Sequence, residues 1–209
     1  MSQPPLSRSD LRRQLRQKRR ALSSAQQKQA SESLCRHLKH LPQLRAARHI
    51  ALYWPADGEI DPRPIARWAW QRGIRCYLPV LHPWSKRRLW FTAFTAKTRF
   101  RRNRFGIAEP IKVARAPLSP KHLDVVLLPL VGFDRSGGRL GMGGGFYDTT
   151  FAFRRHQPGW NRPKLLGVAH QIQEVAGLAL QSWDVPVDGV VTDGGLVGGR
   201  GFRGCFKAP

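Results

Sequence analysis

The 209-residue sequence predicts an α/β fold with three layers, α/β/α, around a mostly parallel, Rossmann-like sheet. Short apolar segments alternate with segments of helical periodicity, which favours parallel strands joined by helices. The run LDVVLLPLVGF at residues 123–133 is almost continuously apolar, as expected for a strand buried on both faces. The glycine-rich stretch RLGMGGGFYD at residues 139–148 follows it, at the edge where such sheets bind ligands.

The first half of the chain predicts two helices, followed by three strands with a helix among them. Residues 9–40 have helical periodicity, and Ser23 and Ser24 form a break and N-cap that divides them into two helices. The next segments predict a strand, a helix that ends on a glycine, and two more strands. These segments are, in order, residues 49–54, 64–73, 74–81 and 88–95.

The second half predicts the remaining strands around the glycine stretch. A helix is expected to begin near Tyr147, after the glycines. A strand, a short helix or loop, and a last strand follow at residues 165–170, 173–181 and 187–192. We expect one domain over residues 1–193 and a flexible Gly/Arg tail over residues 194–209, because the tail has no hydrophobic periodicity.

The composition narrows the class of protein. Hydrophobic residues make up 41% of the chain, enough for a core, but no run reaches the roughly 18 residues of a membrane span. The three cysteines form no CxxC pair, so we expect a reducing cytoplasm. Residues 1–50, rich in Arg, Lys and Ser, leave an organelle transit peptide as an alternative to a basic helix.

The net charge of +23 favours polyanionic partners. Its basic residues are spread along the chain and do not form one tail. We therefore expect non-specific polyanion binding, with neither a specific nucleic-acid partner nor a membrane partner.

The glycine stretch favours phosphate binding. A glycine loop between a buried strand and a helix offers free backbone N–H groups and a positive helix end. The loop is not a Walker A motif, and Phe146 stands where GxGxxG requires its third glycine. Arg139 beside the loop can bind phosphate oxygens with two N–H groups. A tight turn without a ligand is the alternative.

Acidic residues near the loop suggest a metal site. Asp148 is expected just inside the following helix, where a carboxylate either caps the helix or holds Mg²⁺ beside a nucleotide phosphate. Asp184 and Asp188 precede the last predicted strand. In a parallel sheet, this second pair of acids can lie near the glycine loop.

Residues 128–148 resemble the signature of the 5-formyltetrahydrofolate cyclo-ligases, also called methenyltetrahydrofolate synthetases. The shared pattern is an apolar strand ending in Pro-x-x-x-Phe-Asp, a short turn, and R-L-G-x-G-x-G-[YF]-Y-D. Four further segments are similar to family elements and occur in the family order. They are RSDLRRQLRQKRRALS (8–23), ALYWPADGEID (51–61), RFGIAEP (104–110) and WDVPVDGVVT (183–192).

The resemblance implies a reaction and its cofactors. ATP and 5-formyltetrahydrofolate become 5,10-methenyltetrahydrofolate, ADP and phosphate, with Mg²⁺. The formyl oxygen is phosphorylated, N10 attacks the activated carbon, and phosphate departs. Phosphoryl transfer depends mainly on positioning and charge neutralisation, which agrees with a sequence in which no protein nucleophile stands out.

The resemblance also implies the site residues. Those expected at the reacting groups are Arg139, Gly143 and Gly145. Those expected to bind ATP are Arg8, Arg12, Arg139, Leu140, Gly141, Met142, Gly143, Gly144, Gly145, Phe146 and Tyr147. Those expected to contact the folate are Trp54, Glu59, Met142, Gly143, Gly144, Gly145 and Phe146. Asp148 and Asp184 are expected to hold Mg²⁺.

Considered by themselves, two of these residues have simpler interpretations. Glu59 can accept N–H groups of a pterin ring or can be a solvated loop acid. Trp54 can stack on an aromatic ring or belong to the core. The chain also departs from common family residues at Arg8, Met142, Phe146 and Thr149, which affects substrate affinity more than reaction class.

Two other functions remain open from the sequence. Trp and Phe interleaved with Arg at residues 84–105 suggest a non-enzymatic nucleic-acid binder. Another phosphate-handling enzyme, such as a sugar-phosphate isomerase, fits a similar sheet but has no need of ATP. Our preferred prediction is a cytoplasmic monomer that acts on 5-formyltetrahydrofolate, including polyglutamylated forms whose negative charge suits the basic surface.

Overall fold

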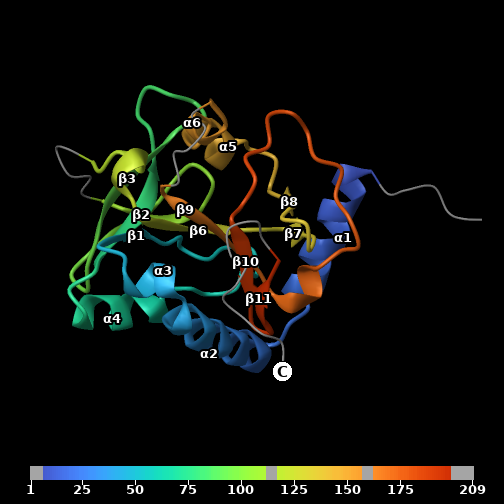
Figure 1. Cartoon of the computed structure of the whole chain (residues 1–209), viewed down its shortest axis with the longest axis horizontal. Helices are drawn as coiled ribbons and strands as arrows, with labels where there is room; N and C mark the ends of the chain where they lie inside the picture. The colour runs from blue at the N-terminus through green and yellow to red at the C-terminus, as the bar shows by residue number, and fades with distance from the viewer. Residues whose placement is uncertain (1–6, 112–116, 157–161, 199–209) are drawn as a thin grey trace, which may run out of the picture.

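The computed structural model describes residues 7–111, 117–156 and 162–198. Its centre is a seven-stranded sheet in the order β11-β10-β9-β6-β1-β2-β3 (Figure 1). Neighbouring strands from β10 to β2 are parallel, and the edge strands β3 and β11 are antiparallel to their neighbours. The strands are β1 (His49–Ala51), β2 (Arg75–Leu81), β3 (Leu89–Phe94), β6 (Val125–Pro129), β9 (Lys164–Val168), β10 (Gly189–Thr192) and β11 (Gly195–Val197). The predicted α/β class with a mostly parallel sheet is confirmed.

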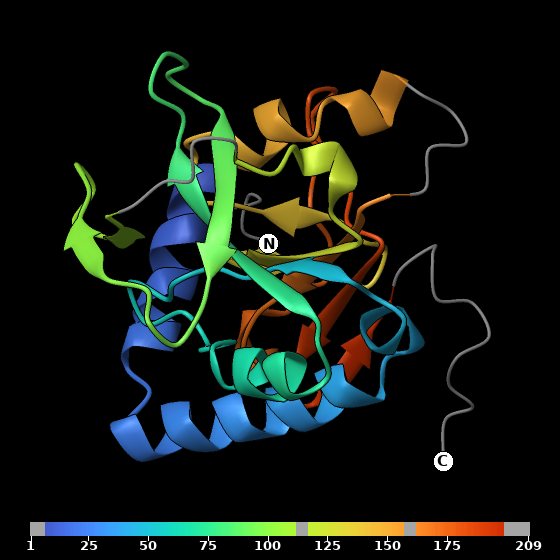
Figure 2. The ribbon, with the colours of Figure 1, turned by 90° about the vertical axis from the view of Figure 1, so that its left-hand side faces the viewer.

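Helices cover both faces of this sheet (Figures 1 and 2). One face carries α2 (Ser24–His40), α3 (Pro42–Arg45) and α4 (Pro64–Gln71), and the other carries α5 (Phe146–Thr150) and α6 (Phe153–His156). α1 (Arg8–Arg20) packs at one side against the 3₁₀ turn η2 (Gln171–Gln173). The smaller elements are β4 (Phe100–Arg102), β5 (Ala108–Pro110), η1 (Pro120–His122), β7 (Gly132–Phe133) and β8 (Arg139–Leu140).

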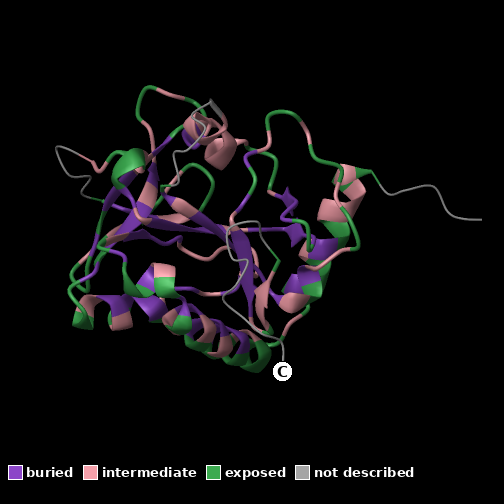
Figure 3. Ribbon diagram, in the orientation of Figure 1, coloured by how far each residue is buried: buried purple, intermediate pink, exposed green. Residues whose placement is uncertain are grey.

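β6 separates two hydrophobic cores. Val125 and Leu127 pack into the core beneath α2 and α4, whereas Val126 and Leu128 pack into the core beneath α5. The sheet is accordingly buried along its centre (Figure 3). This arrangement explains the continuous apolar run, because alternate residues of a strand point to opposite faces. The strand ends at Pro129, earlier than predicted, and residues 132–133 instead begin the β7–β8 hairpin.

The predicted break between the first two helices is confirmed. Ser23 Oγ accepts the Gln26 N–H at 3.3 Å, and Gln26 Oε1 accepts the Ser23 N–H at 2.8 Å. This reciprocal capping box starts α2. The break lets α2 lie along one face of the sheet while α1 packs at its side, where Leu15 is buried.

The structure settles two local predictions and corrects a third. Residues 173–181, expected as a short helix or loop, are loop beyond the end of η2. The sheet continues past residue 193, because β11 pairs with β10 inside the expected tail, while residues 199–209 lie outside the described residues. The helix after the glycine loop has only five residues. Among the described residues, no helix is long and apolar enough to cross a membrane.

Candidate active site

A large cavity lies where the strand order reverses. From β1 the chain adds β2 and β3 on one side and β6, β9 and β10 on the other. Ligands bind beyond the carboxyl ends of strands at such a point. A cavity of about 1620 Å³ opens there, lined by Tyr53 and Trp54 after β1 and by Pro129 at the end of β6. It exceeds the roughly 300–1,000 Å³ of a site for one drug-sized ligand, so it has room for two.

The glycine loop forms one wall of this cavity. Gly141, Gly143, Gly144 and Gly145 all line it. Gly143 and Gly145 have φ of 97° and 65°, which side chains rarely adopt. A Cβ on Gly144 would approach the Phe146 ring to 2.9 Å. The glycines therefore allow left-handed backbone conformations and the close approach of the Phe146 ring. They also leave backbone N–H groups at the cavity wall.

The surroundings of the loop differ from the prediction in two ways. The loop follows the short hairpin strand β8 and not a long buried strand. The following helix, α5, is a single short turn of helix that begins at Phe146. Such a helix supplies little macrodipole, so anion binding here depends on loop N–H groups and on nearby arginines.

α1 supplies two of these arginines. Arg8 and Arg12 both line the cavity. Arg12 Nε donates to the Gly141 carbonyl at 2.9 Å, which fastens α1 to the glycine loop. Burial, followed by the positive charge of nearby Arg8, lowers the pKa of Arg12. Two cations that face one cavity favour an anionic ligand between them.

Arg139 is more enclosed than the sequence suggests. Its side chain is buried, and Nε donates to the Val185 carbonyl at 2.7 Å. A terminal nitrogen pairs with Asp148 Oδ1, which also accepts the Val185 N–H at 3.0 Å. Arg139 and Asp148, predicted separately for phosphate and metal, are thus bonded to each other and to the segment before β10.

Asp184 also lies at the cavity, but Asp188 does not. Asp184 Oδ2 accepts Arg8 at 3.2 Å and the Gln181 N–H at 3.0 Å. Asp188 pairs with Arg154 at 2.6 Å and accepts the Leu165 N–H at 2.7 Å. Of the two acids before the last strand, Asp184 is therefore available to a ligand, whereas Asp188 joins α6 to the sheet.

Trp54 lines the same cavity as the glycine loop. Its ring centroid lies 4.1 Å from that of Phe100, and the guanidinium carbon of Arg63 lies 4.4 Å from the Trp54 ring. Trp54 is partly buried and lines the cavity while it packs against the core beneath α4. The two interpretations of this residue, ring-stacking surface and core residue, are therefore compatible.

Glu59 is a buried carboxylate and not a solvated loop acid. Its side chain is 11% exposed. Oε2 accepts the Ala56 N–H at 3.0 Å, and Oε1 lies 3.8 Å from a terminal nitrogen of Arg19. Burial raises the pKa of Glu59 to about 7, although the Arg19 charge opposes this shift. Near neutral pH this carboxyl can gain or lose a proton at the cavity wall.

The other predicted loop residues separate into two groups. Met142, Phe146 and Tyr147 line the cavity, and Phe146 meets the exposed Phe105 edge to face with centroids 5.7 Å apart. Burial raises the pKa of Tyr147, which keeps its phenol a hydrogen-bond donor. Leu140 is fully buried in a small core with Leu15 and Val131, away from the cavity lining.

Sequence reasoning missed three residues here. Arg19 and Asp57 form a buried ion pair at 2.8 Å beside Glu59, and Phe105 lines the cavity. One signal was present, because Leu11, Leu15 and Arg19 are spaced four apart along one face of α1. A charged residue in line with an apolar stripe indicates a buried partner. Asp57 carries no comparable signal in a loop that also contains Glu59 and Asp61.

Comparisons with known proteins agree with this geometry. The 5-formyltetrahydrofolate cyclo-ligase family profile matches residues 5–193. The chain is 39% identical over 182 residues to the 5-formyltetrahydrofolate cyclo-ligase of Haemophilus influenzae, across 86% of this chain and 94% of that protein. The Escherichia coli K12 protein of the same name is 39% identical over 178 residues, across 85% and 96% of the two chains.

Solved structures agree as well. The 5,10-methenyltetrahydrofolate synthetase of Aquifex aeolicus superposes with a TM-score of 0.78 at 28% identity, covering 93% of this chain and 94% of that chain. The synthetase of Mycoplasma pneumoniae gives 0.70 at 26% identity, covering 90% and 99%. With the glycine loop, the arginines of α1 and Glu59 gathered around one cavity, the chain belongs to the 5-formyltetrahydrofolate cyclo-ligase family.

Proposed function

We propose that this protein converts 5-formyltetrahydrofolate and ATP to 5,10-methenyltetrahydrofolate, ADP and phosphate. The observation that carries the proposal is the shared cavity. One wall has the glycine loop with Arg8 and Arg12, which suit phosphates, and another has Trp54 and Glu59, which suit a pterin. All these groups come from one chain, which supports a monomeric enzyme.

In the proposed reaction, the formyl oxygen attacks the γ-phosphorus of ATP and ADP leaves. N10 then adds to the activated formyl carbon and loses its proton to solvent, and the C–O bond breaks with loss of phosphate to leave the methenyl bridge. The chain positions the two substrates and neutralises charge, and it forms no covalent intermediate. Arg8 and Arg12 offset phosphate charge, while Glu59 accepts N–H groups of the pterin and fixes its orientation.

The carboxylates at the cavity fit a Mg²⁺ ion. Both bonds made to Asp148 fall on Oδ1, and both bonds made to Asp184 fall on Oδ2. The second oxygen of each carboxylate thus stays available to a ligand within the described part of the chain. Those residues contain no cluster of three or more metal-binding side chains, but magnesium beside phosphates needs only one or two carboxylates. Bound there, Mg²⁺ would neutralise phosphate charge.

The test is an absorbance assay. We expect the methenyltetrahydrofolate band to grow when protein, 5-formyltetrahydrofolate and Mg²⁺ are mixed with ATP, and to stay flat without ATP. Growth would exclude a non-enzymatic nucleic-acid binder. A flat trace from protein that still binds ATP would contradict the proposal and favour another phosphate-handling reaction.

The cavity mouth supports a preference for polyglutamylated folate. Arg87, Arg101 and Arg102 are exposed and line the cavity, and no ion pair occupies them among the described residues. Arg87 lies in the β2–β3 connection, and Arg101 and Arg102 lie in β4. Unpaired cations at the entrance attract a polyanionic tail through long-range electrostatics.

We expect KM for a triglutamate substrate to be about threefold to tenfold lower than for the monoglutamate at low salt, and this gap to narrow as salt screens the charges. An Arg87→Gln/Arg101→Gln double variant should lose most of the difference. Arg67→Gln/Arg72→Gln, in α4 and at its C-cap, removes the same charge on the face of the sheet that carries α2 and α4 and serves as the control. Equal KM values for the two substrates would contradict this prediction.

A further inference from the structure

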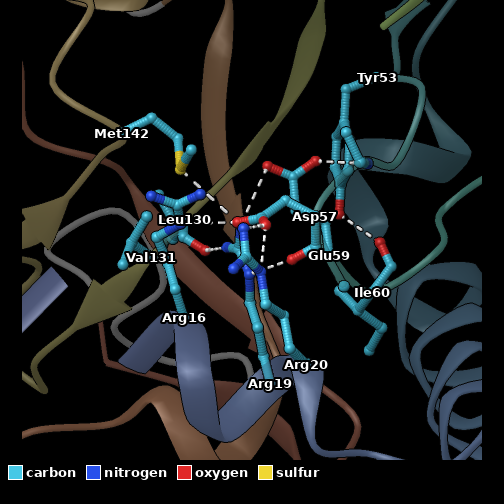
Figure 4. A network of polar contacts seen from close by, with 12 residues as sticks. Arg16, Arg19, Arg20, Tyr53, Asp57, Glu59, Ile60, Leu130, Val131 and Met142 are labelled. Atoms are coloured by element: carbon cyan, nitrogen blue, oxygen red, sulfur yellow. Dashed lines mark hydrogen bonds and ion pairs between the residues drawn. The ribbon is translucent and has the colours of Figure 1, made fainter. Parts of the chain in front are cut away.

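Arg19 connects segments that are far apart in the sequence. Its side chain is fully buried near the end of α1. Nε donates to the Asp57 carbonyl at 2.8 Å, and one terminal nitrogen donates to Asp57 Oδ2 at 2.8 Å (Figure 4). The other terminal nitrogen donates to the Leu130 carbonyl at 3.1 Å. Met142 Sδ at 3.8 Å and Glu59 Oε1 at 3.8 Å complete its surroundings.

These partners come from three segments that are far apart in the sequence, and Asp57, Glu59 and Met142 among them line the cavity. Asp57 and Glu59 belong to the loop after β1, Leu130 follows β6, and Met142 belongs to the glycine loop. The helix that carries Arg19 also carries Arg8 and Arg12, which face the proposed ATP site. One guanidinium therefore contacts the loop after β1, the segment that follows β6 and the glycine loop.

The loop after β1 contains a residue in an uncommon backbone conformation. Asp57 has φ of 54°, in the left-handed region that non-glycine residues seldom adopt, although Asp and Asn tolerate it better than most. A Cβ on the next residue, Gly58, would lie 3.1 Å from the Arg19 carbonyl. Ion pairing with Arg16, Arg20 and Arg19 lowers the pKa of Asp57 to about 2 despite its burial. The loop is thus fixed by contact with the end of α1.

We propose that Arg19 is a positioning residue, which holds Glu59 and the glycine loop at fixed positions relative to the ATP-facing arginines of α1. This inference rests on the proposed function for the identity of the two substrates. The planar guanidinium makes the contacts because its N–H groups point in several fixed directions. A lysine at this position would keep the charge but could not reach Asp57, Leu130 and Met142 together.

Arg19 also belongs to the charge environment of Glu59. Arg16 and Arg19 of α1 favour the ionised carboxylate, and the Ala56 N–H does the same. Asp57 opposes ionisation, and the buried phenols of Tyr53 and Tyr147 lie in the same surroundings. Since Arg19 is the strongest of the favourable charges, its removal should move the ionisation of Glu59 to higher pH.

The experiment compares Arg19→Lys and Arg19→Met with Arg20→Met. Arg20 is the neighbouring residue and also pairs with Asp57, but its side chain is 54% exposed and makes none of the other contacts of Arg19. Both Arg19 variants should raise KM for 5-formyltetrahydrofolate by about tenfold to hundredfold. ATP affinity should fall less, because the contact of Arg19 with the glycine loop is the long one to Met142 Sδ at 3.8 Å. Arg20→Met removes one ion pair of Asp57 and leaves the contacts of Arg19 in place, so its KM for the folate should rise much less than that of either Arg19 variant.

The pH profile separates positioning from a merely structural role. For wild type, kcat/KM for the folate should rise as Glu59 ionises, with a midpoint near pH 7. In Arg19→Met this midpoint should move upward, whereas lost structure alone would reduce the amplitude at an unchanged midpoint. Asp57→Asn, which tolerates the same backbone conformation, should raise KM for the folate in the same direction.

A second readout does not depend on turnover. Amide hydrogen exchange in Arg19→Lys should be faster in residues 55–61 and 141–145, with α2 and α4 unchanged. Unchanged exchange in both loops, or an unchanged KM for the folate in an active enzyme, would overturn the role of Arg19. An inactive wild type whose loops still respond to Arg19→Lys would count against the proposed reaction and not against the positioning role.

Discussion

A Gly143→Val variant is expected to lose turnover by about hundredfold or more while it keeps a cooperative unfolding transition. Gly143 has φ of 97°, where a β-branched side chain is strained by about 1–3 kcal/mol. Within the described part of the chain, and apart from the two neighbours of Gly143, only Arg12 lies within 4 Å of a Cβ built there, at 3.9 Å, so little packing is lost. The loop should relieve the strain by moving, which displaces the N–H groups that face the phosphates.

A matched control separates strain from function. Gly73 follows the C-cap of α4 with φ of 71°, and apart from its chain neighbours no atom of the described residues lies within 4 Å of a Cβ built there. Gly73→Val therefore introduces a similar backbone strain on the face of the sheet that carries α2. Both variants should show similar losses in thermal stability, but only Gly143→Val should lose kcat in the absorbance assay. A fully active Gly143→Val enzyme would refute the role of the loop.

Glu59→Gln is expected to weaken folate binding strongly and yet stabilise the protein at high pH. The wild-type carboxyl has its pKa raised from 4.5 to about 7 by burial. Between these pH values the folded state keeps a proton that the unfolded state has lost, so wild-type stability falls as pH rises through this window. Above pH 7 the loss of folding free energy from ionising the buried carboxyl levels off on the order of 3 kcal/mol. Glutamine has no charge to bury and avoids this loss.

Thermal unfolding at pH 4.5 and pH 8 measures the stability effect. The two proteins should unfold at similar temperatures at pH 4.5, and Glu59→Gln at a higher temperature at pH 8. The KM for 5-formyltetrahydrofolate should rise by about hundredfold, because a carboxylate that accepts N–H groups is replaced by an amide. A glutamine variant that is less stable at pH 8, or one with wild-type KM, would contradict this account of Glu59.

The sequence predicted the fold well where hydrophobic pattern decides the structure. The apolar run that contains β6 and the Ser23 cap both appear in the structure for the reasons given by pattern and capping. Pairing partners were harder to predict. The antiparallel direction of β3, the β7–β8 hairpin and β11 depend on which edges are free once the sheet has formed. Short strands carry too few residues for their own pattern to decide this.

The sequence by itself determined the family signature, the glycine loop and the acids near it, because each is a local pattern of residue types. Only the tertiary structure decided that Arg139 pairs with Asp148, that Leu140 faces the core, and that Glu59 is buried with a raised pKa. It also brought Arg19 to Asp57 across 38 positions of the chain. Ion pairing and desolvation depend on distances in space, which spacing along the chain does not set.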